Sequence, residues 1–304
     1  MAGSRKTPSS RARWTWHEEE VRARSRALRA AGHAVAFVPT MGYLHEGHLS
    51  LVERAREGGA KVIVSIFVNP LQFGPRDDFK AYPRDRAHDA AVLSRAGVEL
   101  VYAPHAQAFY PSRHVTRVHV GGVADPLEGA LRPGHFAGVA TVVSKLLHVV
   151  EPDELWLGQK DAQQVAVLAR MLKDLAWPVR LRVGKTVREG DGLAMSSRNV
   201  RLSAEERVQA GLLYRALRAG QAALHGLAKA RASARGARTV AERAMRSVLD
   251  RATLARVDYA RLVDPLTFEA PLAGATSGLL VVAARFPSAR LIDNLKVRWT
   301  GGAA

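Results

Sequence analysis

Residues 33–50 carry the pattern that decides the fold of this chain. They read HAVAFVP (33–39) followed by TMGYLHEGHLS (40–50). The first stretch is short, apolar and bounded by turn residues, which is typical of a buried strand. Gly42 and Gly47 then loosen the backbone, and helical spacing predicts a helix over Leu49–Glu57. A strand, a glycine-containing turn and a helix are therefore predicted in immediate succession.

The same alternation of strands and helices continues to about residue 184. Further strands are predicted at Lys61–Val68, Val98–Ala103, Glu154–Leu157 and Val179–Val183. Helices are predicted at Trp14–Arg29, Arg86–Ala96, Ala137–Val149 and Ala162–Leu175. This order favours an α/β fold with a Rossmann-like, doubly wound parallel sheet covered by helices on both faces.

The pattern changes after Gly184. Residues 203–252 are helical in spacing, and short strands are predicted near Val257–Val263, Gly278–Ala283 and Ala289–Asp293. We expect a Rossmann-like domain over residues 14–184 and a smaller α+β domain over residues 185–304. The first 13 residues are basic and free of acids, and we expect a disordered tail there, with a transit peptide as the alternative.

The composition limits the classes of protein. Of the 304 residues 47% are hydrophobic and 24% charged, the balance of a soluble protein with a core. No apolar run is long enough to span a membrane. The chain has no cysteine, which excludes disulfides, thiolate metal ligands and cysteine nucleophiles, and fits a reducing, cytoplasmic location.

The net charge of +17 is the feature that points to other partners. Such a surplus could attract nucleic acid, an anionic membrane or polyanionic substrates. It is not accompanied by an RGG repeat, a zinc-knuckle spacing or a basic-aromatic stripe. We therefore expect neither a nucleic-acid nor a membrane partner, and keep a nucleic-acid-binding protein as the weaker alternative.

The two histidines His45 and His48 are the first candidate site residues. In a parallel sheet ligands bind at the carboxyl ends of the strands, and a helix N-terminus there suits phosphate. Two imidazoles three residues apart at that edge can contact one polyphosphate and stabilise its developing charge. Two alternatives stay open: a polar turn with an N-terminal cap, or a zinc pair that would need a third ligand.

Neutral amides follow the next strand, in FVNPLQFG (67–74). Asn69 and Gln72 could orient a hydroxyl or a carboxylate without titrating themselves. The alternative is an Asn-Pro turn that needs no ligand.

Two further segments carry charge suited to phosphate. In LGQKDAQQ (157–164) Lys160 is a mobile cation, and Asp161 could cap the helix that follows or bind a ribose hydroxyl. Gln164 lies one turn later on the same face as Asp161 and Lys160. In DGLAMSSRN (191–199) two hydroxyls and Arg198 form a loop at the proposed domain junction, for which a solvent-exposed linker is the alternative.

Familiar nucleotide and acyl-transfer motifs are missing. The sequence has no Walker GxxxxGK[ST] and no GxSxG, which disfavours a P-loop enzyme and a serine acyl transferase. The remaining class is phosphate chemistry in which positioned hydrogen-bond donors, and no nucleophilic side chain, promote the reaction.

Six stretches together resemble the pantoate–β-alanine ligase family of the HIGH-signature nucleotidyltransferases, over about residues 33–296. PTMGYLHEGH (39–48) resembles the family's HIGH signature and AMSSRN (194–199) its KMSKS loop. The others are FVNPLQFG (67–74), AYPR (81–84), LEGALRPGHFAGV (127–139) and RLIDN (290–294). The HxGH turn alone is shared with cytidylyltransferases, so another nucleotidyltransferase is the alternative.

The resemblance implies an ATP-dependent carbon–nitrogen ligase of pantothenate and coenzyme A biosynthesis. In this family (R)-pantoate and ATP give pantoyl adenylate and pyrophosphate, and β-alanine then displaces AMP to give pantothenate. Mg²⁺ is expected with ATP, bound by phosphate oxygens and water, and we expect no protein ligand for it. The resemblance also suggests a homodimer with small-molecule substrates.

The resemblance also assigns roles to residues by matching position. The catalytic residues are His48 as proton donor, with His45, Lys160 and Arg198 on the phosphates. Gln72, Gln164 and Asn69 are expected to bind pantoate and β-alanine. The expected ATP-binding residues are Pro39, Met41, Gly42, His45, Gly47, His48, Gly158, Lys160, Asp161, Val187, Met195, Ser196, Ser197 and Arg198. The smaller domain is expected to close over the nucleotide as a lid.

Two positions depart from the family pattern. Gln159 stands where the family usually has Glu, and Leu71 replaces a common Met. Both flank residues with assigned roles, so we expect them to tune the activity.

Overall fold

The computed structural model describes residues 12–74, 79, 82–227 and 233–299. Residues 1–11 of the expected tail and Ala81 of the AYPR stretch lie outside this part. The chain divides into two compact units: unit 1 comprises residues 1–119, 137–157 and 172–184, and unit 2 comprises residues 120–136, 158–171 and 185–304. The sequence-based limits of 14–184 and 185–304 did not anticipate that 120–136 and 158–171 pack with the C-terminal part.

Unit 1 is built on a six-stranded sheet with the order β1-β4-β3-β2-β5-β6. The strands are β1 (Arg13–Thr15), β2 (Val35–Thr40), β3 (Lys61–Ile66), β4 (Leu100–Tyr102), β5 (Glu154–Gly158) and β6 (Arg180–Gly184). Strands β1 and β4, β4 and β3, β3 and β2, and β2 and β5 pair in parallel. Pro39 lies opposite Ser65, so β2 and β3 end side by side.

Helices cover both faces of this sheet. The helices of unit 1 are α1 (Glu18–Ala30), α2 (Glu46–Glu57), α3 (Arg86–Arg95), α4 (Ala106–Phe109) and most of α6 (His135–Val150). Leu51 of α2 and Leu93 of α3 pack on Val38 and Val64 of one face. Phe37 and Ile63 alternate with these residues and are fully buried, so the other face is covered too. The predicted Rossmann-like, doubly wound sheet is confirmed.

The N-terminal helix predicted from Trp14 begins later. Residues Arg13–Thr15 form β1, in which Trp14 pairs with Val101 of β4. Helix α1 starts at Glu18, where three consecutive acidic residues suit the positive end of a helix. Pairing with an existing sheet edge overrides the helical spacing of these few residues.

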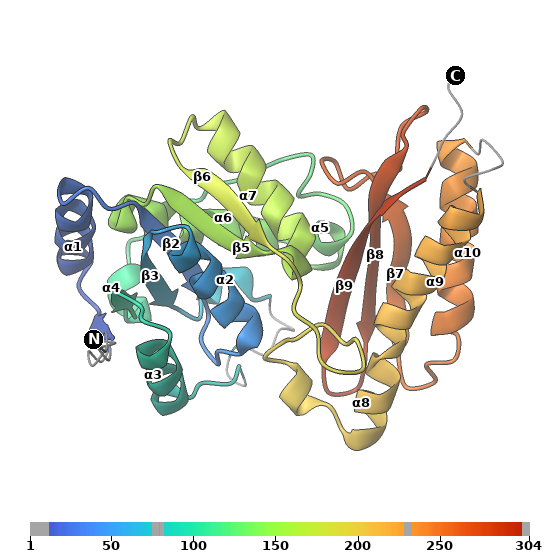
Figure 1. The fold of residues 1–304 in the computed structure, drawn as a ribbon, viewed down its shortest axis with the longest axis horizontal. Coiled ribbons are helices and arrows are strands. Elements are labelled where there is room, and N and C mark those ends of the chain that lie inside the picture. The colour runs from blue at the N-terminus through green and yellow to red at the C-terminus, as the bar shows by residue number, and fades with distance from the viewer. Residues whose placement is uncertain (1–11, 75–78, 80–81, 228–232, 300–304) are drawn as a thin grey trace, which may run out of the picture. The chain divides into compact units, whose positions relative to one another are not determined.

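Unit 2 is a small antiparallel sheet covered by helices (Figure 1). Strands β7 (Arg256–Val263), β8 (Ser277–Arg285) and β9 (Arg290–Arg298) pair in the order β7-β8-β9. The helices are α5 (Glu128–Leu131), α7 (Ala162–Asp174, up to Met171 in this unit), α8 (Ala204–Ala210), α9 (Leu212–Leu227) and α10 (Ala234–Leu249). This confirms the predicted smaller α+β part.

The two faces of this small sheet have different partners. Helices α9 and α10 pack on one face, where Leu217 and Met245 join Leu280 and Val282 in a core. Val123, Phe136 and residues of α7 pack against Val281 and its neighbours on the other face. Within the described residues, no helix is both long and apolar enough to cross a membrane.

Candidate active-site residues

His45 and His48 lie at the start of α2, just beyond the carboxyl end of β2. His45 is the N-cap residue, and its Nδ1 accepts a hydrogen bond from the backbone N–H of Gly47 at 3.2 Å. The backbone N–H of His45 donates in turn to Nδ1 of His48 at 3.4 Å. The helix therefore begins at Glu46, three residues before the predicted start, because these histidines supply its cap.

This capping arrangement also orders the two imidazoles for chemistry. The ring centroids lie 4.1 Å apart, and the planes are tilted by 40°. Since Nδ1 accepts a backbone hydrogen bond in both rings, the neutral rings carry their proton on Nε2. The N-terminal cap and the phosphate contact are thus compatible, because they use different nitrogen atoms. Among the described residues no three His, Cys, Asp or Glu side chains are grouped as metal ligands.

The turn before His45 is held by a buried carboxylate. Asp89 of α3 is 2% exposed and accepts hydrogen bonds from the backbone N–H groups of Tyr43 at 3.0 Å and Leu44 at 2.8 Å. Gly42 has φ +82°, and a Cβ there would lie 3.0 Å from Asp89 Oδ2. Burial raises the pKa of Asp89 above its usual value, although the two N–H groups favour its charged form.

Asn69 is the centre of a hydrogen-bond network at the end of β3. Its Oδ1 accepts from the Leu71 backbone N–H at 3.2 Å and from the Tyr110 hydroxyl at 3.1 Å. Its Nδ2 donates to Gln72 Oε1 at 3.0 Å and to Gly138 O at 3.1 Å. Asn69 is only 1% exposed, so its side chain fixes the neighbouring Gln72. The Asn-Pro turn forms as a 3₁₀ helix over Pro70–Gln72.

Gln72 connects this turn to the HxGH segment. Its Nε2 donates to the sulfur of Met41 at 3.1 Å. The backbone of α6 runs very close by, since a Cβ on Gly138 would lie 2.2 Å from Leu71 O and 2.7 Å from Gln72 Cα. A residue larger than glycine at position 138 would therefore displace the turn that carries Gln72.

In unit 2, Asp161 lies beside the cationic side chain of Lys160. The 3₁₀ helix η2 (Gln159–Asp161) follows β5, and Lys160 Nζ lies 3.3 Å from Asp161 Oδ1. Desolvation acts to raise the pKa of Asp161, yet that pKa lies below its usual value because of the charges of Lys160, Arg198 and His135. Side chains from three separate segments therefore favour the charged form of this carboxylate.

Residues 187–195 form a tight hairpin, which includes the first half of the segment 191–199 that was predicted as a loop. Arg188 and Ala194 form an antiparallel bridge, and the Met195 backbone N–H donates to Val187 O at 3.0 Å. The Ser196 hydroxyl then accepts the backbone N–H of Arg198 at 3.2 Å. The hairpin therefore leads directly into an ordered turn that contains Ser196, Ser197 and Arg198.

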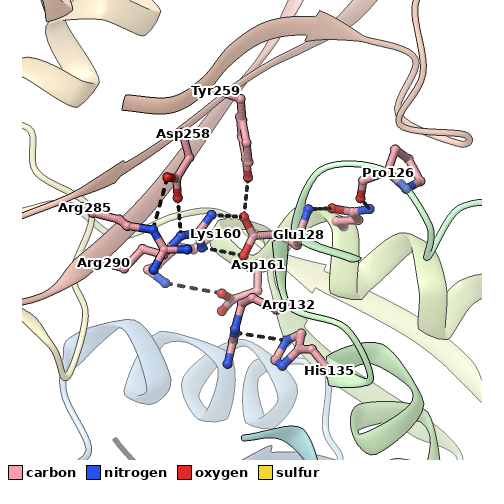
Figure 2. A network of polar contacts seen from close by, with 11 residues as sticks. Pro126, Glu128, Arg132, His135, Lys160, Asp161, Asp258, Tyr259, Arg285 and Arg290 are labelled. Carbon is pink, nitrogen blue, oxygen red and sulfur yellow. Dashed lines mark hydrogen bonds and ion pairs between the residues drawn. The ribbon is translucent and has the colours of Figure 1, made fainter. Parts of the chain in front are cut away.

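A buried ion network lies in the same unit (Figure 2). Glu128 of α5 pairs with Arg290 of β9 through two contacts of 2.6 Å and accepts the Tyr259 hydroxyl at 2.7 Å. Arg290 also donates to Asp258 at 2.7 Å. The Arg290 contacts hold the pKa of Glu128 below its usual value, although burial opposes them. This network fastens the 120–136 segment, with His135, to the sheet.

Comparison with known proteins supports one assignment. The family model described as pantoate-beta-alanine ligase matches residues 14–296. The chain belongs to the pantoate–β-alanine ligase family. Pantothenate synthetase of Chloroflexus aurantiacus is 51% identical over 273 residues, which is 90% of this chain and 95% of that protein.

Solved structures of the family agree with the fold. The crystal structure of pantothenate synthetase from Thermus thermophilus is 46% identical, with a TM-score of 0.84 over 93% of this chain and 98% of that one. The pantoate–β-alanine ligase of Francisella tularensis, solved in complex with β-γ ATP and β-alanine, is 31% identical, with a TM-score of 0.74 over 93% of this chain and 97% of that one. The family inferred from the six motifs is confirmed.

The expected site residues of this family member fall into both units. Unit 1 brings together Pro39, Met41, Gly42, His45, Gly47, His48, Asn69 and Gln72. Unit 2 contains Gly158, Lys160, Asp161, Gln164, Val187, Met195, Ser196, Ser197 and Arg198. Their individual roles stay predictions.

Sequence reasoning assigned no role to Asp89, His135 or Glu128. Asp89 gives no local signal, because it is one polar residue in a predicted helix. His135 and Glu128 lie in LEGALRPGHFAGV, where the motif match could have directed attention to them.

Proposed function

We propose that this chain joins pantoate to β-alanine at the expense of ATP, giving pantothenate, AMP and pyrophosphate. The observation that carries the proposal is the pair of imidazoles of His45 and His48 at the carboxyl end of β2, in a chain of this family. The family member complexed with β-γ ATP and β-alanine supports the same reaction.

The reaction has two steps. A pantoate carboxylate oxygen attacks the α-phosphorus of ATP, and the bond from that phosphorus to the bridging oxygen of pyrophosphate breaks. The β-alanine amine then attacks the activated carbonyl, loses a proton, and AMP leaves. Adenylation is needed because a free carboxylate is a poor acyl donor, whereas AMP is a good leaving group. The protein contributes alignment of the reactants and stabilisation of phosphate charge.

In unit 1 the histidines are proposed to act on the triphosphate through Nε2. His48 is the proposed proton donor and His45 a phosphate contact. Their backbone hydrogen bonds at Nδ1 support this assignment, because those bonds fix the tautomer that donates from Nε2. Pro39, Met41, Gly42 and Gly47 are proposed to line the nucleotide at the same strand end.

In unit 2, Lys160, Ser196, Ser197 and Arg198 are proposed to bind phosphate oxygens. The charges of Lys160 and Arg198 lower the pKa of Asp161 against desolvation, which supports the presence of cations near this turn. Gly158, Val187 and Met195 are proposed to complete the contacts to ATP.

The neutral amides are proposed to bind the other substrates. Gln72 and Gln164 are assigned to the pantoate hydroxyl and carboxylate, with Gln72 also near β-alanine. Asn69 was predicted as a substrate ligand as well. Its burial and its four internal hydrogen bonds support a second role, that of holding Gln72 in place.

Mg²⁺ is proposed to arrive as the complex with ATP. It prefers phosphate and water oxygens to a dedicated protein cage. When bound, the ion would neutralise charge on the departing pyrophosphate. Loss of pyrophosphate release on chelation of Mg²⁺ would test this point.

We further propose that the enzyme is a cytoplasmic homodimer with small-molecule substrates and no nucleic-acid or membrane partner. These points rest on the resemblance to the family and on the sequence. Light scattering after gel filtration tests the dimer, and binding to duplex DNA at physiological salt tests the alternative raised by the charge of +17.

The decisive experiment supplies ATP, Mg²⁺, pantoate and β-alanine to the purified chain. AMP and pantothenate should appear in equal amounts, and pantoate alone should support ATP–pyrophosphate exchange. Pyrophosphate release that depends on CTP and needs no β-alanine would instead identify another nucleotidyltransferase.

A further inference from the structure

Two consecutive residues of strand β9, Asp293 and Asn294, are buried polar residues without an assigned function. They are 3% and 4% exposed. They belong to the RLIDN stretch, and β9 is an edge strand of the three-stranded sheet. Burying a polar side chain costs free energy unless it forms hydrogen bonds, so the partners of these two residues indicate their role.

Asn294 holds the backbone of the turn that carries Lys160. Its Nδ2 donates to Gln159 O and to Lys160 O, both at 2.9 Å. Its Oδ1 accepts a hydrogen bond from Gln159 Nε2 at 3.1 Å. The amide thus uses both hydrogens and its oxygen on residues 159 and 160, and fixes the path of η2.

Asp293 holds the hairpin that leads into Ser196–Arg198. Arg188 donates to its two carboxylate oxygens at 2.6 and 3.0 Å. The same guanidinium donates to Gly192 O at 3.0 Å and lies 3.9 Å above the Tyr214 ring. Since Arg188 bridges to Ala194, the ion pair anchors the hairpin directly before its phosphate-binding turn.

We propose that Asp293 and Asn294 are positioning residues for the adenylation step. Adjacent strand residues are held about 3.4 Å apart and face opposite sides of the strand. Strand β9 therefore fixes the position of two segments at once: the turn with Lys160 and the hairpin that leads to Ser196–Arg198. The proposal rests on the proposed function, because it concerns the groups assigned to ATP.

Gln159, one of the two departures from the family pattern, forms hydrogen bonds with Asn294 in both directions. Its side-chain amide completes the reciprocal contact with Asn294, in which each residue both donates and accepts. A carboxylate at position 159, as is usual in the family, could not donate to Asn294 Oδ1. The departure from the family pattern thus tightens the attachment of η2 in this chain.

The variant Asn294→Ala tests the proposal by removing all three hydrogen bonds. We expect pantoate-dependent ATP–pyrophosphate exchange to fall by about thirtyfold, since small misplacements of reacting groups cost about a hundredfold. The rate at which β-alanine consumes preformed pantoyl adenylate should stay within about twofold of wild type, because that step does not require transfer at the α-phosphorus. Gln159→Ala and Asp293→Asn are milder variants, expected to slow exchange by about threefold and about tenfold, and they serve if Asn294→Ala does not fold.

A double-mutant cycle separates positioning from general structure. On the Lys160→Ala background, Asn294→Ala should cause almost no further slowing, because its effect is exerted through Lys160. The matched control is Glu242→Gln, which weakens a side-chain contact to the Leu262 backbone N–H on β7, the opposite edge strand. It should leave exchange unchanged.

Three results would overturn the proposal. They are a folded Asn294→Ala enzyme with wild-type exchange, equal slowing with and without Lys160, and equal slowing of both half-reactions. If the wild-type chain itself makes no pantothenate, the proposed function fails instead.

Discussion

Asp89 accepts the backbone N–H of Leu44 at 2.8 Å, one residue before His45 caps helix α2. The same carboxylate accepts the N–H of Tyr43, whose φ of +52° places it in the left-handed region. A side chain on α3 therefore fixes the backbone that carries both histidines, so helix α3 supports the candidate site in unit 1.

Substitution Asp89→Asn should disrupt this turn. One amide N–H₂ would face a backbone N–H, so we expect the free energy of unfolding to fall by about 2 kcal/mol. Adenylation should slow by about tenfold or more, as His45 and His48 lose their placement. Chemical denaturation and ATP–pyrophosphate exchange measure the two effects. The control Asp85→Ala removes the α3 cap to His88 N, and should cost about 1 kcal/mol without slowing exchange.

The two functions of His45 can be separated by substitution. His45→Ala removes both the cap and the imidazole, and should lower the free energy of unfolding by about 1 kcal/mol. His45→Asn keeps a capping acceptor, so its stability should stay close to that of wild type. Exchange should be slowed to a similar extent in both variants, because both lose Nε2. If only the alanine variant is slow, His45 acts as a cap alone.

Removal of the cation at Lys160 should affect the first half-reaction. We expect Lys160→Ala to lower pantoate-dependent exchange by about a hundredfold, the scale of losing one donor to a developing charge. Lys185→Ala is the matched control, since Lys185 is an exposed lysine of the same unit. Slowing confined to the attack of β-alanine would contradict the assigned role.

The close approach at Gly138 predicts a substrate-specific defect. In Gly138→Ala the new Cβ would overlap Leu71 O, so the turn with Gln72 must move. We expect the KM for pantoate to rise by about tenfold, while the KM for ATP changes little. Gly226→Ala on α9, where a Cβ meets nothing within 4 Å, should raise the Tm slightly and leave both constants unchanged.

The buried pair of Glu128 and Arg290 predicts a dependence of stability on acid pH. The pKa of Glu128 is lower in the folded protein than its ordinary value of 4.5. Its stabilisation is therefore complete above about pH 4.5 and is lost as the pH falls through the lowered pKa. Denaturation series at several pH values should show this slope in wild type.

The variant Glu128→Gln should lack this dependence of unfolding free energy on acid pH. At neutral pH, Glu128→Gln should lower the free energy of unfolding by about 3 kcal/mol, since a charged partner is left buried. Glu20→Gln, which breaks the exposed pair with Arg13, should cost less than about 1 kcal/mol. An equal loss in the two variants would show that burial does not strengthen the pair.

Local patterns predicted the regular elements well because their causes are local. Strands β2 and β3 follow from short apolar runs, and α7 from its amphipathic spacing. The strand β1 was missed, because three residues become a strand only through pairing with β4. The N-terminal cap was an open alternative for His45 and His48, but the predicted start at Leu49 was three residues late. The bonds of these histidines to Gly47 N and His45 N depend on the turn that Asp89 fixes.

The sequence by itself determined the parallel sheet, because short-range spacing encodes strand–turn–helix units, and its motifs determined the family. It also located the segments whose side chains are proposed to bind phosphate. Only the tertiary structure decided that Asp89 holds the histidine turn, that Glu128 is fastened to Arg290, and that Asp293 and Asn294 anchor two separate segments. The two residues of each contact are separated by between 45 and 162 positions in the chain. Asn294, for example, lies 135 positions after Gln159. Such pairs have no fixed spacing, so only the folded backbone brings them together.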